Sequence, residues 1–282
     1  MLHGVPGTAL WGLRARAEES GRSGGLFQDA LAQSWYERLA GFSSPELDAW
    51  YTPTLQQSIA LRTLILDQAV RAHFHHCSAP VLVELGAGFS TRFSRLQPRH
   101  GQWYELDIPP LMELRLSLRE PPDPRHWVLA YSVLEPDWLA HLKAHDPSQI
   151  LLLAEGLLMF LSWAEVEALF RRLAEALPGA VIVFDVLGRL NFKAAQAFGE
   201  ALDAPVHWGA ADLSRVCQTL GLEQGEDLSL PAQLRLHPDY GRELRWLQRL
   251  ILKQRWLTRR MGGTVMGRFP LAASHAKLKI DV

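Results

Sequence analysis

The sequence predicts a doubly wound α/β sheet that is preceded by a helical N-terminal region. Between about residues 79 and 188, short apolar runs alternate with helical patterns of ten or more residues, as parallel strands and their crossover helices do. One of these runs leads into a glycine-rich turn, and an acid follows at the end of the next run. In such a sheet, ligands bind outside the carboxyl ends of the strands, where the strand order reverses.

The N-terminal zone, from Thr8 to about His76, carries apolar residues at helical spacing and is expected to contain helices only. Polar or glycine-rich segments interrupt it at residues 20–25 and 42–45. In the second interruption, Ser43 or Ser44 can cap the helix that follows.

The alternating zone is expected to supply five strands and three helices, and the remainder of the chain further elements. The five strands are expected at Val81–Leu85, Gln102–Leu106, His126–Tyr131, Gln149–Ala154 and Ala180–Asp185, and the helices near Leu111–Leu118, Pro136–Ala144 and Ala164–Ala176. Beyond Gly188, we expect helices at Lys193–Leu202 and Ala211–Leu220, a strand at Leu222–Leu230, a long basic helix from Arg242 to about Met261, and a last edge strand at Val265–Phe269.

No segment has the composition of an interdomain linker, so we expect one integrated domain. Residues 1–78 are its helical cap. Residues 79–282 are its Rossmann-like core, with an insertion around 187–209 and a basic C-terminal helix.

Composition restricts the partners and the compartment. Lys plus Arg number 29 and Asp plus Glu 30, so the net charge of −1 provides no overall field for nucleic acid or an anionic membrane. The two cysteines, Cys77 and Cys217, are too few for a disulfide framework and fit the reducing cytoplasm. The first 25 residues lack the apolar core of a signal peptide, and the longest apolar run, Ile150–Leu161, is too short to span a bilayer.

The most informative segment is Val81–Thr91, an apolar strand that runs into a Gly-x-Gly turn and a helix start. Because glycine has no Cβ, Gly86 and Gly88 can take positive φ and let a ligand lie directly on the backbone. Ser90 or Thr91 can cap the next helix.

Asp107 lies 19 residues beyond Gly88, where a carboxylate can accept both hydroxyls of a ribose. NAD and S-adenosylmethionine both use this arrangement. A dinucleotide favours a third small residue in the turn, where this chain has the bulkier Thr91. Glu84, just before the turn, suits the cationic amino group and sulfonium of S-adenosylmethionine better than a pyrophosphate. We therefore favour S-adenosylmethionine.

Several sequence blocks carry a family resemblance. They are Glu84-Leu-Gly-Ala-Gly-Phe-Ser-Thr-Arg-Phe, Trp103-Tyr-Glu-Leu-Asp-Ile-Pro, Ser132-Val-Leu-Glu-Pro-Asp-Trp and Ala154-Glu-Gly-Leu-Leu-Met-Phe, with Arg16-Ala-Glu, Phe27-Gln-Asp and Ala60-Leu-Arg-Thr-Leu-Ile-Leu-Asp before them. These blocks resemble those of the leucine carboxyl methyltransferase superfamily, in particular its branch of tetracenomycin-type polyketide O-methyltransferases. The resemblance covers roughly residues 8–190.

The resemblance implies a class I methyltransferase fold, with one antiparallel strand ending the sheet, and S-adenosylmethionine as cofactor. It also implies site residues. Arg62 would bind the methionine carboxylate, Gly86 and Gly88 would underlie the methionine moiety, Asp107 would hold the ribose, Ser132 and Val133 would flank the adenine, and Glu155 and Gly156 would lie by the amino group. The chain departs from the family at Phe160, usually tyrosine, and at Ala30, usually proline.

Glu155 stands out without the resemblance, because a carboxylate within an apolar run is costly unless it is paired. The catalytic residues remain unassigned. A carboxylate acceptor is already ionised at neutral pH, whereas a phenol gains from a general base. Candidates for that base are Tyr131, Asp185 and His207.

The acceptor pocket is expected to form from the first sixty residues, Leu187–Gly209 and the C-terminal helix. Six tryptophans lie in these parts and can offer flat walls to a planar substrate or can simply pack a helical cap: Trp11, Trp35, Trp50, Trp208, Trp246 and Trp256.

Two further patterns favour a structural interpretation. Residues 235–268 carry a local charge of +7, but apolar residues at helical spacing indicate a helix with a solvated basic face, not a nucleic-acid site. Adjacent residues in a helix point apart, so we expect no metal at His73, His75, His76 and Cys77.

Four functional hypotheses remain open. We favour a methyltransferase that acts on a carboxyl or phenolic oxygen of a small, polyketide-like molecule. The others are a carboxyl methyltransferase for a protein C-terminus, an NAD-dependent oxidoreductase, and a binding module that keeps the cofactor without catalysis. The oligomeric state is not predicted.

Overall fold

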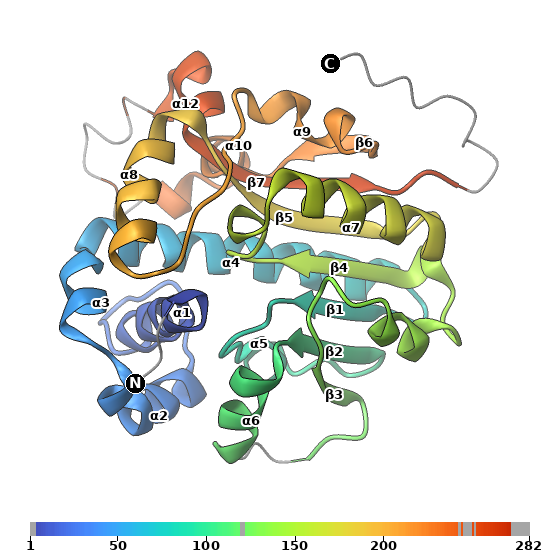
Figure 1. The fold of residues 1–282 in the computed structure, drawn as a ribbon, viewed down its shortest axis with the longest axis horizontal. Helices are drawn as coiled ribbons and strands as arrows, with labels where there is room; N and C mark the ends of the chain where they lie inside the picture. The colour runs from blue at the N-terminus through green and yellow to red at the C-terminus, as the bar shows by residue number, and fades with distance from the viewer. Residues whose placement is uncertain (1–3, 119–121, 242–243, 245–249, 251, 272–282) are drawn as a thin grey trace.

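A mixed seven-stranded sheet forms the centre of the computed structural model, which describes residues 4–118, 122–241, 244, 250 and 252–271 (Figure 1). The strands are β1 (Val81–Leu85), β2 (Gln102–Asp107), β3 (His126–Ala130), β4 (Ile150–Ala154), β5 (Val181–Leu187), β6 (Glu223–Asp227) and β7 (Gly262–Arg268). Their order is β3-β2-β1-β4-β5-β7-β6, and β1 to β5 pair in parallel. The order reverses at β1 and β4, so the predicted doubly wound sheet is confirmed.

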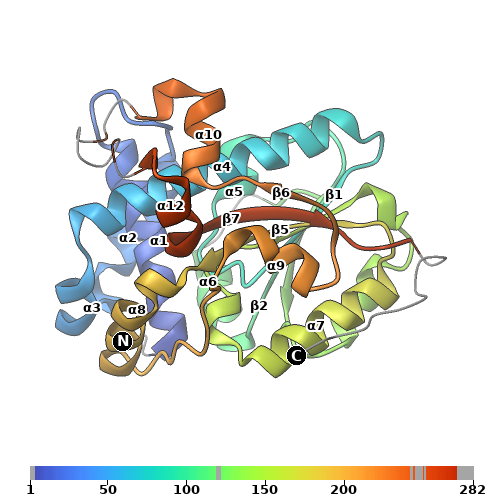
Figure 2. The ribbon, with the colours of Figure 1, turned by 90° about the horizontal axis from the view of Figure 1, so that it is seen from above.

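Helices cover both faces of this sheet. They are α1 (Gly4–Ser20), α2 (Ala30–Leu39), α3 (Pro45–Trp50), α4 (Pro53–His76), α5 (Arg92–Leu96), α6 (Pro109–Ser117), α7 (Trp163–Ala176), α8 (Arg189–Ala201), α9 (Leu213–Thr219), α10 (Leu230–Leu236) and α12 (Arg255–Met261). Short 3₁₀ segments are η1 (Ala40–Phe42), η2 (Asp137–Leu142), η3 (Pro147–Gln149), η4 (Leu158–Phe160) and η5 (Pro238–Gly241). Figure 2 shows α4 and α10 on one face, and α7 and α9 on the other.

The alternation of side chains along β1 divides the core into two layers. Val81, Val83 and Leu85 pack in a cluster with α7 and α9, whereas Leu82 packs with α4 and α5. All five residues of β1 are buried because helices cover both faces of a parallel sheet. The near-continuous apolar run in the sequence is the signature of this arrangement.

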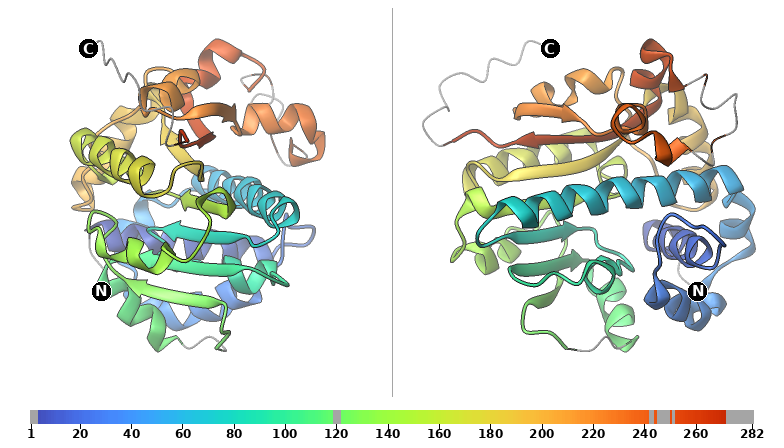
Figure 3. Two further views of the ribbon diagram at one scale, coloured as in Figure 1. Left: turned by 90° about the vertical axis from the view of Figure 1, so that its right-hand side faces the viewer. Right: turned by 180° about the vertical axis from the view of Figure 1, so that it is seen from behind.

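The N-terminal zone is helical, as predicted. Ser44 caps α3 through the backbone N–H of Leu47, and Thr52 caps α4 through that of Leu55. The 24-residue α4 runs along the sheet across most of the molecule (Figure 3). A third apolar cluster joins α1, α2, α3 and the start of α4 to α6 and to the end of α8. This cluster holds α1 over the carboxyl ends of the strands.

Each of the five predicted parallel strands is present, with ends within two residues of the prediction. The segment predicted as a helix at Pro136–Ala144 is instead the 3₁₀ helix η2, because this short connection buries only Trp138 and Leu142 and forms i→i+3 bonds such as Leu139 N–H to Pro136 O.

The C-terminal predictions need two corrections. The last strand, β7, is not at the edge of the sheet: it lies antiparallel between β5 and β6, and β6 is the edge strand with every residue exposed. The continuous helix expected from Arg242 to Met261 is interrupted, because Gln254 has an extended backbone (φ −85°, ψ 91°) and α12 begins only after it. Residues 242–243, 245–249 and 251 lie outside the described part of the chain. None of the helices among the described residues is long and apolar enough to cross a membrane.

Candidate functional site

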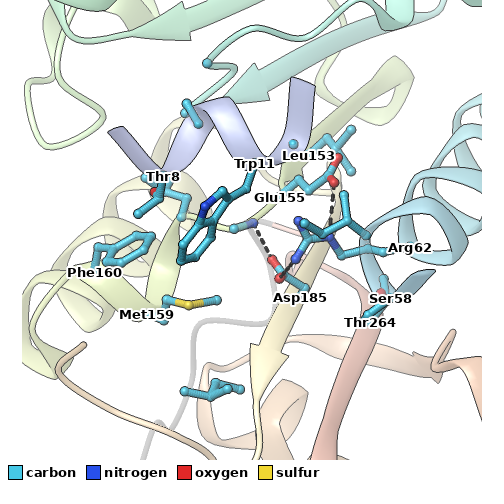
Figure 4. Close-up of a pocket in the computed structure, with 18 of the residues that line it drawn as sticks. Thr8, Trp11, Ser58, Arg62, Leu153, Glu155, Met159, Phe160, Asp185 and Thr264 are labelled. Carbon is cyan, nitrogen blue, oxygen red and sulfur yellow. Dashed lines mark hydrogen bonds and ion pairs between the residues drawn. The ribbon is translucent and has the colours of Figure 1, made fainter. Parts of the chain in front are cut away.

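A cavity of about 690 Å³ opens at the carboxyl ends of the strands. The segments that follow β1, β2, β3, β4 and β5 line it, and α1, α4 and α8 enclose it. Figure 4 shows its two halves: Trp11, Met159 and Phe160 lie on one side, and Arg62, Glu155 and Asp185 on the other. The location is the one that the doubly wound topology predicts.

The turn after β1 presents bare backbone to this cavity. Gly86 and Gly88 have φ values of 66° and 54°, as predicted, in the left-handed region that favours glycine. A Cβ at Gly86 would lie 2.9 Å from Leu157 Cδ1, and one at Gly88 would lie 3.2 Å from Ala9 Cβ. The backbone conformation therefore disfavours a side chain at either position, and a Cβ at either would require Leu157 or Ala9 to shift.

The two predicted caps behave differently. Ser90 Oγ accepts the backbone N–H of Arg92 at 3.3 Å, whereas the Thr91 hydroxyl donates to Asp29 at 2.6 Å and makes no capping bond. Thr91 thus connects the glycine turn to the loop before α2.

Asp107 ends β2 beside the glycine turn. Its carboxylate accepts the backbone N–H of Gly88 at 2.8 Å and that of Ile108 at 2.7 Å. Burial raises the pKa of Asp107, and these two amide donors oppose the rise. Ser132 and Val133, which follow β3, line the same cavity.

Glu155, Arg62 and Asp185 meet on the opposite wall from three different elements. Arg62 Nε donates to Glu155 at 3.0 Å, and Nη1 donates to Asp185 at 2.8 Å. Asp185 also accepts the backbone N–H of Gly156 at 2.6 Å, and Gly156 has a φ of 64°. Burial alone would raise the pKa of Glu155, but Arg62 and Arg92 hold it at about 2. Glu155 is therefore ionised at neutral pH.

Glu84 lines the cavity, but its carboxylate is engaged inside the protein. It accepts the Ser90 hydroxyl at 3.0 Å and the Trp103 indole N–H at 3.0 Å, and it pairs with Arg92. It contributes to the site by fixing Arg92.

Two arginines of the site have no role in the sequence prediction. Arg92, 2% exposed, joins Asp67, Glu84 and Glu155. Arg16 is 6% exposed, donates to Phe89 O at 2.6 Å and lies 3.6 Å from Asp29. Burial lowers the pKa of Arg16 to about 10. Both stand within the sequence blocks that carry the family resemblance, which is the signal that could have identified them.

The structure separates the three candidate bases. Asp185 lines the cavity. Tyr131 packs against the core beside His141, with ring centroids 6.1 Å apart, and His207 is exposed. Among the described residues, the lining contains no histidine, lysine, tyrosine or cysteine.

The second half of the cavity is apolar and contains aromatic rings from the regions expected to bind the acceptor. Phe198 of α8 contacts Trp11 and Trp50 edge-on, with centroids 5.6 and 6.5 Å apart, and Phe160 lies nearby on the lining. The other tryptophans differ: Trp35 is in the core, Trp208 packs on Trp163, and Trp246 and the side chain of Trp256 lie outside what the structure describes.

The histidine-rich end of α4 lies away from the cavity lining. His73 Nε2 contacts Gln149 O at 2.8 Å, and Cys77 Sγ lies 3.6 Å from His73 Nδ1. Within the described ranges, no group of three or more His, Cys, Asp or Glu side chains is arranged to hold a metal ion.

The sheet order and the site at its carboxyl ends define a Rossmann-like fold of the class I methyltransferase type. The same fold occurs in the structure of a proposed methyltransferase from Thermobifida fusca, with a TM-score of 0.59, 16% identity and 95% of each chain covered. The chain belongs to the leucine carboxyl methyltransferase family, whose model matches residues 9–174.

Two bacterial methyltransferases are also similar to this chain in sequence. The tetracenomycin polyketide synthesis O-methyltransferase of Streptomyces glaucescens is 30% identical over 213 residues, which cover 74% of this chain and 76% of the relative. A proposed S-adenosyl-L-methionine-dependent methyltransferase of Streptomyces avermitilis is 32% identical over 185 residues, which cover 61% of this chain and 65% of that relative. The predicted family is confirmed, and the predicted cofactor is the one named for the second relative.

Proposed function

We propose that this protein uses S-adenosylmethionine to methylate a carboxyl or phenolic oxygen of a small molecule. The observation that carries the proposal is the pairing of the side-chain-free turn at Gly86 and Gly88 with Asp107, across one cavity from Arg62 and Glu155. The turn and the acid suit a nucleoside, and the charged wall suits the zwitterionic end of an amino acid.

The residues present fit this cofactor in both shape and charge. Asp107 would hold the ribose, with Ser132 and Val133 beside the adenine and Gly86 and Gly88 beneath the methionine moiety. Arg62, Glu155 and Gly156 would hold the amino-acid end, where Arg16 offers further positive charge, and Glu84 supports this wall through Arg92. When bound, the cofactor supplies an electrophilic methyl group on a cationic sulfur.

The chain contributes alignment and exclusion of water instead of a covalent nucleophile. Each of the four carboxylates that line the described cavity already accepts at least two hydrogen bonds or ion pairs. A carboxylate acceptor is already ionised at neutral pH, so its methylation needs no general base from the cavity lining. A phenol would have to ionise without a dedicated side chain.

The apolar half of the cavity supports a small acceptor with a flat body. Trp11, Trp50, Phe160 and Phe198 line it and carry no charge, and aromatic rings favour stacked or edge-on contacts with other rings. Phe160, which replaces the tyrosine usual in the family, brings no hydroxyl to this wall.

The test is to incubate the protein with methyl-labelled S-adenosylmethionine and a metabolite extract, and then to separate small molecules from proteins. Label in a small molecule supports the proposal, and its release by mild alkali distinguishes an ester from an ether. Label in protein alone would support a carboxyl methyltransferase for a protein C-terminus instead.

A further inference from the structure

Asp185 connects two parts of the cavity wall that are far apart in the sequence. One oxygen accepts Arg62 Nη1 of α4 at 2.8 Å, and the other accepts the backbone N–H of Gly156, after β4, at 2.6 Å. Asp185 itself lies on β5 and is 8% exposed. Three elements are thus joined through one buried carboxylate (Figure 4).

This connection fixes the direction of the Arg62 guanidinium. Nε is held by Glu155 and Nη1 by Asp185, so the planar group is bound along two of its three nitrogens. The third, Nη2, has no hydrogen-bond partner among the described residues, and it would lie 3.6 Å from a Cβ built on Gly156. Arg62 lines the cavity with this nitrogen available to an anion.

The same contacts argue against a role for Asp185 as a proton acceptor. Both carboxylate oxygens already accept a hydrogen bond, and one of them pairs with a permanent positive charge. If Asp185 took up a proton, its ion pair with Arg62 would weaken. Arg62 would then be held on this wall by Glu155 alone. The geometry thus suits a group that holds its neighbours in place.

We infer that Asp185 is a positioning residue: it fixes Arg62, and the backbone at Gly156 beside it, for the amino-acid end of the cofactor. This inference rests on the proposed function. It predicts that Asp185 affects recognition of the carboxylate and ammonium groups, but not recognition of the nucleoside, which lies toward Asp107.

Two ligands separate these contributions without any acceptor. S-adenosylhomocysteine carries the amino-acid end, whereas 5′-methylthioadenosine keeps the nucleoside and sulfur but lacks it. In calorimetry, Asp185→Asn should lower the affinity for S-adenosylhomocysteine at least tenfold. It should change the affinity for 5′-methylthioadenosine less than twofold. Asp185→Glu, which keeps the charge, should recover part of the loss. The matched control Asp107→Asn should lower the affinity for both ligands.

Other outcomes would overturn the inference. The residue does not act through Arg62 if Asp185→Asn leaves the affinity for S-adenosylhomocysteine unchanged. The same conclusion follows if it lowers the affinities for both ligands equally. A loss of turnover at unchanged affinity would show a proton acceptor. If Asp185→Asn does not fold, Arg62→Gln tests the pair from its other side and should show the same selective loss. Failure of the unaltered protein to bind either ligand would contradict the proposed function itself.

Discussion

The carboxylate of Asp107 accepts the backbone N–H of Gly88 at 2.8 Å, which ties the end of β2 to the glycine turn after β1. The acid and the turn are therefore one unit, although they stand 19 residues apart. Because the second oxygen is held by Ile108 N–H, the carboxylate has a fixed orientation toward the cavity. A ribose diol bound there would meet a preset acceptor.

Removal of this acceptor should weaken cofactor binding. We expect Asp107→Ala to lower the affinity for S-adenosylhomocysteine at least tenfold, or about 1.4 kcal/mol or more. Calorimetry measures this directly. Asp146→Ala is the matched control, since Asp146 also accepts a backbone N–H but lies on the surface outside the cavity lining. Equal affinities in both variants would show that the nucleoside does not lie at Asp107.

A methyl group on the glycine turn should also weaken binding. Gly88→Ala adds a Cβ at a φ of 54° and 3.2 Å from Ala9 Cβ, whereas Gly24→Ala adds one at a φ of 78° with nothing within 4 Å. Each variant should lose about 1 kcal/mol of unfolding free energy from backbone strain. Only Gly88→Ala should lose S-adenosylhomocysteine affinity, at least tenfold. Similar affinities in the two variants would contradict a ligand on the turn.

The aromatic wall should affect the acceptor and not the cofactor. Phe198→Ala removes the ring between Trp11 and Trp50, so the KM for the acceptor found by methyl labelling should rise at least tenfold. The affinity for S-adenosylhomocysteine should stay within twofold. Trp127→Phe alters an exposed tryptophan of β3 that is not part of the cavity lining, and should leave that KM unchanged. A normal KM in Phe198→Ala would place the acceptor elsewhere.

Glu155 should make stability depend on acid pH. Its pKa is about 2 in the folded state, below the ordinary 4.5, because Arg62 and Arg92 outweigh its burial. The ionised form therefore stabilises the fold above pH about 4.5, and this contribution, at most about 3 kcal/mol, is lost as the pH falls toward 2. The difference in unfolding free energy between the unaltered protein and Glu155→Gln should narrow over this range in urea titrations.

The exposed Glu175→Gln on α7 is the control for that titration and should differ little from the unaltered protein at any pH. A difference for Glu155→Gln that does not change between pH 7 and pH 3 would mean that its two arginines do not determine its ionisation.

The strands and the conformation of the glycine turn beside Asp107 could be predicted because their signals are local. The apolar run at Val81–Leu85 followed by two glycines specifies a strand and a turn within a dozen residues, and Asp107 follows at a fixed interval. These features depend on backbone conformation, which short sequence patterns report well.

The charged wall could be predicted only in part, because it depends on tertiary contacts. Arg92 meets Asp67 of α4, Glu84 of β1 and Glu155 after β4, and no sequence interval relates these partners. The same tertiary contacts pair Glu84, which the sequence pattern assigns to the cofactor site, with Arg92 inside the protein. At the C-terminal end, every residue of β6 is exposed and β6 carries no apolar pattern, so the sequence does not identify it as the edge strand and predicts β7 there.

The most direct test of the central claim is calorimetry of the unaltered protein with S-adenosylhomocysteine and, separately, with NADH. A side-chain-free turn beside Asp107, opposite a wall of arginines and carboxylates, predicts saturable binding of S-adenosylhomocysteine at one site and no binding of NADH. Tight binding of NADH with no heat from S-adenosylhomocysteine would contradict that claim.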